Sequence, residues 1–443
     1  MSDYDIAIVG AGIVGTALAA QLASHARVLV LDRRGQAGST ALAPGYVGQL
    51  NTLAPLTELA QRSVAAYRAI SGAFDDVGGL EVATSPAELD AMEVRAALAR
   101  SRGLPAEVVS GARARELAPA FVEGVEGGLH FPSDGTADAR VITAAYRAAA
   151  LAAGAVFVDA DVSAIEEGVE GEGTQRKEGM ERTEGTERKE ARKVTLATLA
   201  GPFSAHTLVL CTGVWSGDFL PLPAVSVAHM YAYSAARPRR PRSPFVRIPS
   251  ANVYTRDHGD VDGIGSYDHD PVEVSADAMR THTCAVGGFD AFHDVLARAL
   301  RVLPAHTRVG FEGGVTSEGG ADEGGERAER AFAEMRRARE EGQACAFNGL
   351  FKVTPDGMPL AGRVRKGVYC AVGVWVTHAA GTTGVLADMI LEDLGMGEAK
   401  DLELRKALDP LRFEGKADAV EVALRTYNDI PRTLRNFMQD AAP

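Results

Sequence analysis

The sequence predicts an α/β fold, and three observations support this prediction. The first is a continuous apolar run near the amino terminus, "DIAIVG" (residues 5–10), which is typical of a parallel strand buried on both faces. The second is a glycine-rich turn directly after it, followed by a helical segment and another apolar run, "VLVLD". The third is a similar strand–turn–helix pattern far along the chain, "AVGVWVTHAAGTTGVLADMI" (371–390). Strands that alternate with helices in this way form parallel sheets.

The first turn has the glycine spacing of a nucleotide-binding loop. Gly10, Gly12 and Gly15 follow the pattern G-x-G-x-x-G between the first strand and its helix. In this pattern the first glycine allows a tight turn, the second lets a pyrophosphate approach the backbone, and the third lets the helix pack on the sheet. Asp32 ends the second strand, where a carboxylate accepts hydrogen bonds from a ribose hydroxyl. The segment therefore predicts a Rossmann-type dinucleotide site, without deciding between NAD and FAD.

The composition excludes several functional classes. The chain has 443 residues, enough for one large domain or two joined domains, and a formal net charge of −13. An acidic protein of this kind is expected to repel nucleic acid and anionic membranes. No run approaches the ~18 apolar residues of a membrane span, and the acidic start "MSDYD" is unlike a signal peptide, so we expect a cytoplasmic location. The four cysteines are too scattered for a disulfide framework or a metal site.

Further motifs follow along nearly the whole chain. A small-hydroxyl turn, "GST" (38–40), comes after the second strand, and a later helix leads into a predicted strand near Val162. "LVLCTGVWSG" (208–217) contains a strand that ends in a Thr-Gly turn, and "LFKVTPDGMPLAG" (350–362) precedes the last turn. With these motifs in this order, the chain resembles the D-amino-acid oxidase superfamily of FAD enzymes, especially its sarcosine oxidase and dimethylglycine dehydrogenase branch.

The resemblance implies FAD as the cofactor and gives each motif a role. The first turn would hold the pyrophosphate, the "GST" turn would lie along the ribityl chain, and the strand at Val162 would flank the adenine. The last turn, residues 379–383, would present a helix N-terminus to the isoalloxazine ring, where free N–H groups and the helix dipole favour the negative charge of reduced flavin. The residues expected to contact FAD are Gly10, Gly12, Ile13, Val14, Gly15, Asp32, Arg33, Gly38, Ser39, Thr40, Leu42, Val162, Thr212, Gly213, Trp215, Thr377, Ala380, Gly381 and Thr382.

The expected domain organisation is discontinuous. The Rossmann-type FAD-binding domain is expected to comprise residues 1–85, 130–222 and 346–443. The second unit, an α+β substrate domain built on a mixed or antiparallel sheet, is expected to comprise residues 86–129 and 223–345. Residues 166–193 contain few apolar side chains and an imperfect repeat, so we expect a flexible insert between two strands. Residues 312–341 are expected to begin as a glycine-rich loop and to end as a charged surface helix.

Candidate catalytic residues come mainly from three strand-like segments. His229 and Tyr231 lie two residues apart and would share one face of a strand. The same spacing recurs in two further pairs, Tyr254 with Arg256 and Tyr267 with His269. One member of each pair is expected to face the flavin pocket, and an exposed or core position is the alternative for each. His378 is the stronger candidate because it adjoins the helix start expected at the flavin, where an imidazolium would stabilise reduced flavin.

The chain departs from the family pattern at the known flavin attachment positions. Leu42 stands where relatives often carry a histidine that is bonded covalently to flavin. Gly349 stands where monomeric sarcosine oxidases carry a flavin-linked cysteine, and Cys345 is four residues too early for that link. Noncovalent FAD is therefore favoured.

The substrate side departs from the family pattern as well. Thr377 replaces the lysine that binds the substrate carboxylate in sarcosine oxidases. A carboxylate would need another cation, for which Arg62 and Arg256 are the candidates, unless the substrate lacks a carboxylate. The sequence shows no segment that resembles the folate-binding half of dimethylglycine dehydrogenases, so we expect that folate would not capture an aldehyde product on this polypeptide.

These observations predict an FAD-dependent amine oxidoreductase. It would oxidise a C–N bond of a small amine or N-alkyl amino acid by hydride transfer to flavin N5, and the imine product would hydrolyse. Oxygen or another electron acceptor would reoxidise the flavin, and an oxidase is favoured over a dehydrogenase. Three alternatives stay open: an NAD-linked dehydrogenase, a flavoenzyme that oxidises a 2-hydroxy acid, and a catalytically silent flavoprotein subunit. The first of these would leave the last turn unexplained.

Overall fold

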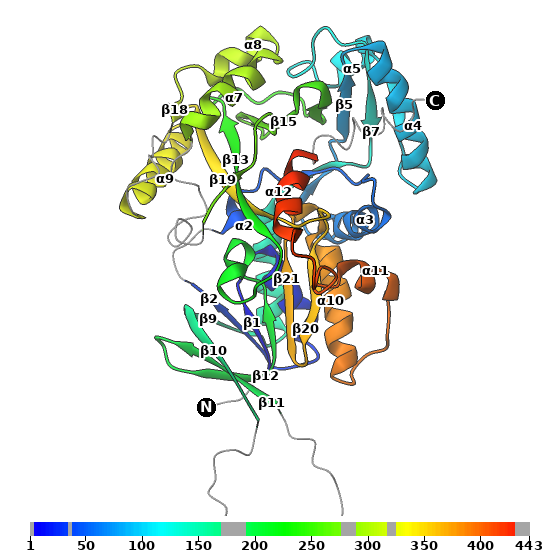
Figure 1. The fold of residues 1–443 in the computed structure, drawn as a ribbon. Coiled ribbons are helices and arrows are strands. Elements are labelled where there is room, and N and C mark those ends of the chain that lie inside the picture. Colours follow the sequence, from blue (N-terminus) through cyan, green and yellow to red (C-terminus); the bar gives the residue numbers. More distant parts are fainter. Residues whose placement is uncertain (1–3, 34–37, 170–191, 276–288, 317–324, 430–443) are drawn as a thin grey trace, which may run out of the picture.

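Two large sheets form the body of the molecule, one above the other in Figure 1. The computed structural model of the chain describes residues 4–33, 38–169, 192–275, 289–316 and 325–429. None of the helices in these ranges combines the length and the apolar character needed to cross a bilayer. The arrangement of mixed and parallel sheets with helices confirms the predicted α/β fold.

The lower sheet has a parallel core that begins at the amino terminus. Its parallel strands, in spatial order, are β21 (Val368–Val372), β12 (Phe203–Leu210), β1 (Tyr4–Val9), β2 (Val28–Asp32) and β9 (Val156–Asp159). β20 (Leu360–Arg365) pairs antiparallel with β21 at one side. β1, β2 and β21 are almost fully buried, which explains why each of them is a continuous apolar run.

Helices from distant parts of the chain pack together on this sheet. The helices in contact with one another are α1 (Ile13–Leu22), α3 (Ala54–Arg68), α6 (Ala139–Ala152) and α10 (Ala379–Asp393). α1 contacts both α6 and α10, and α10 also contacts α3. α11 (Leu402–Leu408) lies beside β20 at the edge of this group (Figure 1). The apolar side chains of α1, α10 and β1 form one continuous core, so the first and last glycine-rich turns lie close in space.

The upper sheet is mixed, as predicted for the second unit. Its strands, in spatial order, are β18 (Val315–Thr316), β19 (Cys345–Val353), β13 (Val225–Tyr233), β16 (Asp262–Ser266), β15 (Val253–Asp257), β14 (Phe245–Ile248), β5 (Gly79–Ala83), β7 (Gly127–Phe131) and β6 (Glu107–Ser110). β17 (Val272–Glu273) also pairs with β13. Most pairs are antiparallel, whereas β14 with β5 and β18 with β19 are parallel.

The remaining elements surround the two sheets. Helices near the upper sheet are α4 (Pro86–Ser101), α5 (Gly111–Leu117), α7 (Phe289–Arg301), α8 (Ala305–Arg308) and α9 (Gly325–Glu340). α12 (Ala419–Asp429) lies between the two sheets in Figure 1 and contacts β13 and β19. A small sheet contains β3 (Tyr46–Val47), β8 (Gly135–Ala137) and β4 (Phe74–Asp75). Short helical turns are α2 (Ser39–Leu42), η1 (Gly213–Asp218), η2 (Pro249–Ala251), η3 (Val309–Phe311) and η4 (Val376–His378).

The ends of the expected flexible insert are strands. β10 (Val162–Val169) and β11 (Arg192–Thr198) form an antiparallel hairpin whose pairing continues to Val169 opposite Arg192. The insert expected over residues 166–193 therefore begins and ends inside paired strands, and its residues 170–191 lie outside the described residues. Pairing satisfies backbone groups whatever the side chains are, and charged side chains suit an exposed sheet edge, so polarity alone did not reveal these strands.

Two strands pair differently from what the predicted domain limits suggest. β5 and most of β19 fall in segments expected of the FAD-binding domain, yet both pair in the upper sheet. The chain therefore crosses between the two sheets more often than the predicted domain limits imply. The domain limits themselves stay a prediction.

Candidate active site

A cavity of about 1290 Å³ lies between the two sheets and is lined by both. From the lower sheet it is bounded by the turns after β1, β2 and β12, which are carboxyl ends of parallel strands, where α/β folds bind ligands. From the upper sheet it is bounded by side chains of β13, β14, β15 and β19. Its volume exceeds the ~300–1,000 Å³ of an ordinary small-molecule pocket, so it has room for a dinucleotide together with a small substrate.

Most of the predicted site residues meet at this cavity. The predicted residues that line it are Gly10, Gly12, Ile13, Val14, Asp32, Arg33, Gly38, Ser39, Thr40, Leu42, Val162, Thr212, Gly213, Trp215, Thr377, His378, His229, Tyr254 and Tyr267. The predicted residues that do not line it are Gly15, Ala380, Gly381, Thr382, Arg62, Arg256 and His269.

The three glycines of the first turn have different roles. Gly10 has φ +103°, and a Cβ there would lie 2.4 Å from the carbonyl oxygen of Cys211. A Cβ at Gly15 would lie 1.9 Å from the carbonyl oxygen of Gly10. A Cβ at Gly12 would meet only the hydroxyl of Thr40, at 3.1 Å, and would otherwise stand in the cavity. The fold itself therefore requires Gly10 and Gly15, whereas the space at Gly12 is free for a ligand.

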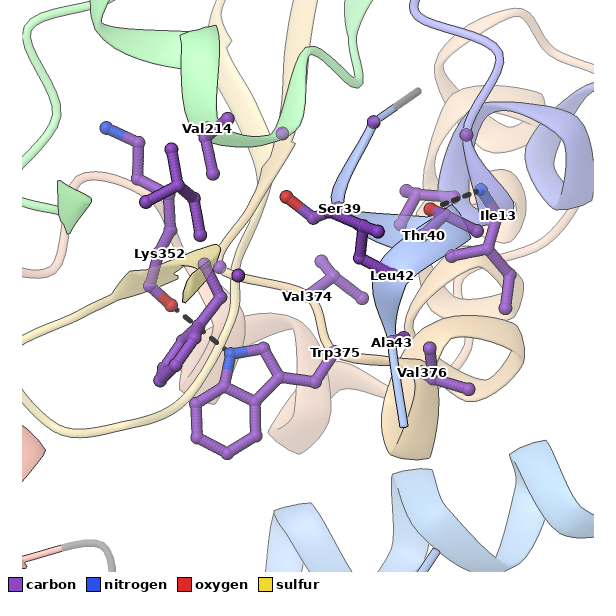
Figure 2. A pocket seen from close by; sticks show the side chains of 18 of the residues that line it. Ile13, Ser39, Thr40, Leu42, Ala43, Val214, Lys352, Val374, Trp375 and Val376 are labelled. Atoms are coloured by element: carbon purple, nitrogen blue, oxygen red, sulfur yellow. Dashed lines mark hydrogen bonds between the residues drawn. The ribbon is translucent and has the colours of Figure 1, made fainter. Parts of the chain in front are cut away.

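Polar groups beside this turn fit a nucleotide. The backbone N–H of Ala11 donates to Asp32 Oδ2 at 2.5 Å, and burial raises the pKa of this carboxyl group. The backbone N–H of Ile13 donates to Thr40 Oγ1 at 3.2 Å. The buried hydroxyls of Ser39 and Thr212 have no hydrogen-bond partner among the described residues. Such hydroxyls fit the ribityl and phosphate groups of FAD because buried polar groups are normally satisfied. Figure 2 shows the Ser39 hydroxyl pointing away from Thr40, into the space near Val214.

The last turn reaches the cavity one turn earlier than predicted. Residues 373–378, including η4, line the cavity, whereas the first turn of α10 lies behind them. The N–H of Gly381 donates to Ser63 Oγ at 2.9 Å, and a Cβ at Gly381 would lie 2.4 Å from the carbonyl oxygen of Leu59. Ala380, Gly381 and Thr382 therefore do not line the cavity, and Gly381 packs α10 against α3, so the contact of these three residues with FAD stays a prediction. The exact start of a helix is difficult to predict from sequence. Here the short helical turn η4 precedes α10, so η4 borders the cavity and the first turn of α10 does not.

His378 lies at the cavity, and its burial opposes the charge that the sequence suggested for it. The side chain is buried, and burial lowers its pKa to about 4. Burial is the cause of this shift, and no carboxylate among the described residues counteracts it. A buried imidazole in such surroundings favours the neutral form. Burial therefore favours the neutral imidazole near pH 7, and an imidazolium at the flavin stays a prediction.

An aromatic wall built from the upper sheet faces the cavity. His229 Nε2 lies 2.9 Å from the Tyr254 hydroxyl, and the rings of His229 and Tyr267 are 4.3 Å apart between centroids. Burial lowers the pKa of His229 to about 3, so this imidazole is neutral as well. Phe351 and Trp375 continue the wall. The structure thus brings together three of the predicted catalytic residues on three neighbouring segments.

The two arginines predicted as carboxylate partners lie elsewhere. Arg62 donates to Asp401 Oδ1 at 2.8 Å and also pairs with Glu58. Arg256 donates to the carbonyl oxygens of Pro44 and Ala137. Neither side chain lines the cavity. The prediction that Arg62 or Arg256 binds a substrate carboxylate is therefore corrected, because both side chains are hydrogen-bonded to residues far away in the sequence.

Sequence analysis missed another arginine, Arg247 on β14, which lines the cavity. Its guanidinium lies 4.6 Å from the centroid of the Tyr46 ring and 3.5 Å from Glu81 Oε1. Glu81 is buried and is already bonded to Arg95 at 2.8 Å. A signal for this residue was present, since Arg247 is the lone charge in the apolar strand "FVRI".

Lys352 is a further cavity residue that sequence analysis did not single out. Its ammonium group donates to the carbonyl oxygen of Ala224 at 3.3 Å, and burial lowers its pKa. Its own carbonyl oxygen accepts a hydrogen bond from Trp375 Nε1 at 3.2 Å (Figure 2). Lys352 thereby fixes the position of Trp375 beside the aromatic wall.

Thiols at the cavity are poorly placed to be nucleophiles. Cys211 lines the cavity, but burial raises the pKa of its thiol. Cys345 is a buried residue of β19 in the upper sheet, does not line the cavity, and has its pKa raised to about 11 by burial. Leu42 and Gly349, which stand at the attachment positions that the family resemblance implies, both line the cavity.

Comparisons with known proteins give the family. The model of the family described as FAD dependent oxidoreductase matches residues 5–389. Human mitochondrial sarcosine dehydrogenase is 25% identical over 288 residues, which cover 61% of this chain and 30% of that protein. Glycine oxidase from Geobacillus kaustophilus is 27% identical over 230 residues, which cover 48% of this chain and 55% of that protein. The matches thus span about a third to a half of the length of these curated relatives.

The crystal structure of glycine oxidase from Geobacillus kaustophilus has the same fold. It matches with a TM-score of 0.65 and 21% sequence identity, covering 94% of this chain and 100% of that chain. The family match extends over both sheets and over every turn that borders the cavity from the lower sheet. The chain therefore belongs to the D-amino-acid oxidase family of FAD-dependent oxidoreductases.

Proposed function

We propose that this protein oxidises the C–N bond of a small amino acid or N-alkyl amino acid, which binds with its carboxylate at Arg247. The observation that carries this proposal is a cavity with a cationic guanidinium on one wall and neutral aromatic and imidazole groups on another. FAD, when bound, supplies the acceptor for the hydride that leaves the carbon beside the nitrogen. An NAD-linked dehydrogenase does not agree with the family to which the chain belongs.

The charges around Arg247 favour an anionic ligand group. Arg95 and Arg247 share the single carboxylate of Glu81. Burial raises the pKa of the nearby Asp134 to about 7, so this group is only partly ionised at neutral pH. Among the described residues, the two guanidinium groups therefore lack a full countercharge. A substrate carboxylate would supply the missing charge in the bidentate geometry that arginine favours.

The aromatic wall suits the amine end of the same substrate. The amine must be neutral when hydride leaves its α-carbon, and a wall without negative charge does not stabilise the protonated amine. His229 is neutral, and Tyr254 and Tyr267 present hydroxyl-bearing rings beside it. These large side chains also exclude water from the space around the reacting carbon.

The cofactor would be held without a covalent bond. Ala11, Gly12 and Ile13 would surround the pyrophosphate, and Ser39 and Thr212 would use their unpartnered hydroxyls. The raised thiol pKa of Cys211 and the absence of nucleophiles at Leu42 and Gly349 support noncovalent binding. Oxygen as the electron acceptor is supported by the likeness to glycine oxidase.

An anaerobic substrate panel tests the proposal. The flavin absorbance of the purified protein is followed after mixing with paired compounds that differ only in the carboxylate, such as sarcosine against dimethylamine and proline against pyrrolidine. We expect bleaching by carboxylate-bearing amines, and then hydrogen peroxide formation in air. Bleaching by lactate or glycolate alone would contradict amine oxidation, and bleaching by no member of the panel would favour a silent subunit. Acid precipitation should release all the flavin.

A further inference from the structure

A continuous hydrogen-bonded chain of four side chains runs from the cavity to the protein surface. Tyr254, which lines the cavity, contacts His229 Nε2 at 2.9 Å. His229 Nδ1 lies 3.0 Å from the Tyr427 hydroxyl, and this hydroxyl lies 2.9 Å from His269 Nε2. His269 is half-buried, and its Nδ1 lies 2.7 Å from the carbonyl oxygen of Asp270, in an exposed contact. Tyr427 and His269 are not part of the cavity wall, so the chain leads out of the site.

The direction of every hydrogen bond in this chain follows from its outer end. The carbonyl oxygen of Asp270 only accepts, so the Nδ1 of His269 must carry a hydrogen. Burial lowers the pKa of His269, so the ring is neutral and its Nε2 accepts from Tyr427. The Tyr427 oxygen then accepts from His229 Nδ1–H, and His229 Nε2 accepts from Tyr254. The Tyr254 oxygen then donates its hydrogen to His229 and keeps lone pairs that can accept a proton, on a residue that lines the cavity.

We propose that Tyr254, His229, Tyr427 and His269 form a proton relay that carries the proton of a bound substrate ammonium group from the cavity to solvent. The relay rests on the proposed function, because an amine is protonated in water and must become neutral before its C–N bond is oxidised. Each of the four groups can both accept and donate a proton, as a relay requires.

The proton balance of one passage is complete. The substrate nitrogen loses one proton to the Tyr254 oxygen, and the Tyr254 proton moves to His229 Nε2. The Nδ1 proton of His229 moves to Tyr427, and the Tyr427 proton moves to His269 Nε2. His269 is then an imidazolium, which releases its Nδ1 proton to water at the exposed end. The passage leaves the hydrogen bonds of the chain reversed, and the hydroxyls and imidazoles reorient before the next passage. Burial holds the pKa of Tyr254 well above its usual value, so the transfer is concerted rather than through a tyrosinate.

The outer end of the relay is suited to hold a proton briefly. Asp268 and Asp270 lie beside His269 and favour its charged form, while Arg298 on α7 opposes it. Arg298 is bonded to Asp268 at 2.7 Å, which weakens its effect on the imidazole. The rings of Phe292, Tyr427 and His229 also neighbour His269 and carry no charge near neutral pH. Burial still lowers the pKa of His269, so an imidazolium formed here gives up its proton to solvent near neutral pH.

Anaerobic stopped-flow experiments on the FAD-loaded full chain test the relay. Flavin absorbance and a pH-indicator dye are followed together in weak buffer, with an amine that bleaches the wild type. Tyr427→Phe removes one hydroxyl from the relay without changing the shape of the core. We expect it to slow bleaching and proton release at saturating substrate by about tenfold or more, with little change in KM. Tyr369→Phe is the matched control, since Tyr369 is also a buried tyrosine whose hydroxyl bonds to Asp393 away from the cavity.

Chemical rescue separates a relay from a structural role. We expect imidazole in the buffer to restore proton release in His269→Ala in a saturable way, because a free imidazole can occupy the vacated space. His130→Ala, at a half-buried histidine on β7 away from the cavity, should show no effect of imidazole. Wild-type rates in Tyr427→Phe, or a slow His269→Ala variant that imidazole does not restore, would overturn the relay.

Histidine tautomers give a readout that needs no turnover. Nitrogen-15 NMR of the FAD-loaded chain should show the Nδ1–H tautomer at both His229 and His269, assigned with the His269→Ala variant. An Nε2–H tautomer at His229 would reverse the polarity and overturn the relay. If no amine bleaches the flavin, the proposed function fails on that observation, and the tautomers still decide whether the polarity required for the relay exists.

Discussion

The guanidinium of Arg247 lies 4.6 Å from the centroid of the Tyr46 ring, and both residues line the cavity between the two sheets. This contact joins β14 of the upper sheet to β3, which follows the "GST" turn in the chain. Tyr46 holds the guanidinium by a cation–π contact that does not neutralise it. Arg247 is therefore positioned by an aromatic ring and still able to bind an anion.

Arg247→Met should weaken the binding of carboxylate-bearing amines. A hydrogen-bonded charge pair contributes about 2–3 kcal/mol, so we expect KM to rise by roughly 10²-fold for such substrates. The fold should persist because Glu81 keeps its bonds to Arg95. Steady-state kinetics with and without a substrate carboxylate is the measurement. Arg62→Met, at a surface ion pair, is the control, and an equal loss in both variants would contradict the assignment.

Gly12→Val and Gly10→Val should fail in different ways. The side chain at Gly12 would enter free space in the cavity, so the chain should fold and bind FAD at least about 10²-fold more weakly. The side chain at Gly10 would collide with the backbone of Cys211 at a positive φ, so this variant should not fold. Circular dichroism and flavin titration distinguish the two. Normal flavin content in Gly12→Val would show that the pyrophosphate lies elsewhere.

Gly381→Ala should destabilise the fold, whereas Gly384→Ala on the same helix should not. The new methyl group at position 381 would press on the backbone of Leu59, and overpacking of this kind costs about 1–3 kcal/mol. A methyl group at position 384 would meet nothing within 4 Å and would gain up to about 1 kcal/mol of helix propensity. Urea unfolding measures both. Equal stability of the two variants would show that α3 and α10 are not packed as described.

His378 should make the protein less stable in acid. Its pKa is about 4 in the folded chain and 6.5 in the unfolded chain, so the unfolded state binds the proton more readily between these values. The contribution to stability is complete above pH 6.5, falls as the pH drops, and is lost near pH 4. This difference corresponds to about 3 kcal/mol.

Urea unfolding at pH 7 and at pH 4.5 measures the effect of His378. The loss of stability between the two pH values should be smaller in His378→Gln than in the wild type. His25→Gln, at an exposed histidine, serves as the control and should keep the wild-type pH dependence. An unchanged pH dependence in His378→Gln would mean that the imidazole is not buried in its neutral form.

Residues 170–191 should be dispensable. Val169 and Arg192 pair across the hairpin, so an Asn-Gly turn can replace the segment between them. Closing a shorter loop costs less entropy, so we expect equal or higher stability, by up to about 2 kcal/mol, with unchanged flavin content and turnover. A variant with the same segment in scrambled order is the control. Loss of activity in both variants would show that the native segment has a specific role.

Sequence alone determined the parts of the site that are local in the chain. The run from β1 through Gly10, Gly12 and α1 to Asp32 is continuous, so strand periodicity, turn chemistry and spacing identified it. The α/β class and the mixed second sheet follow from the same alternation of apolar patterns. These features depend on neighbours a few residues apart, and such neighbours can be inferred from the sequence.

Tertiary structure decided which distant side chains share the cavity. Arg62, Arg247 and Arg256 are chemically alike. The packing of the two sheets places Arg247 at the cavity wall, whereas Arg62 and Arg256 are hydrogen-bonded to residues outside their own segments and do not line the cavity. His229 and Tyr427 are 198 positions apart, yet they are hydrogen-bonded because α12 packs against β13 and β19. Burial, which sets the charge of His378, is likewise a property of the whole fold. Local patterns specify elements, whereas long-range packing specifies which of their side chains meet and in which protonation state.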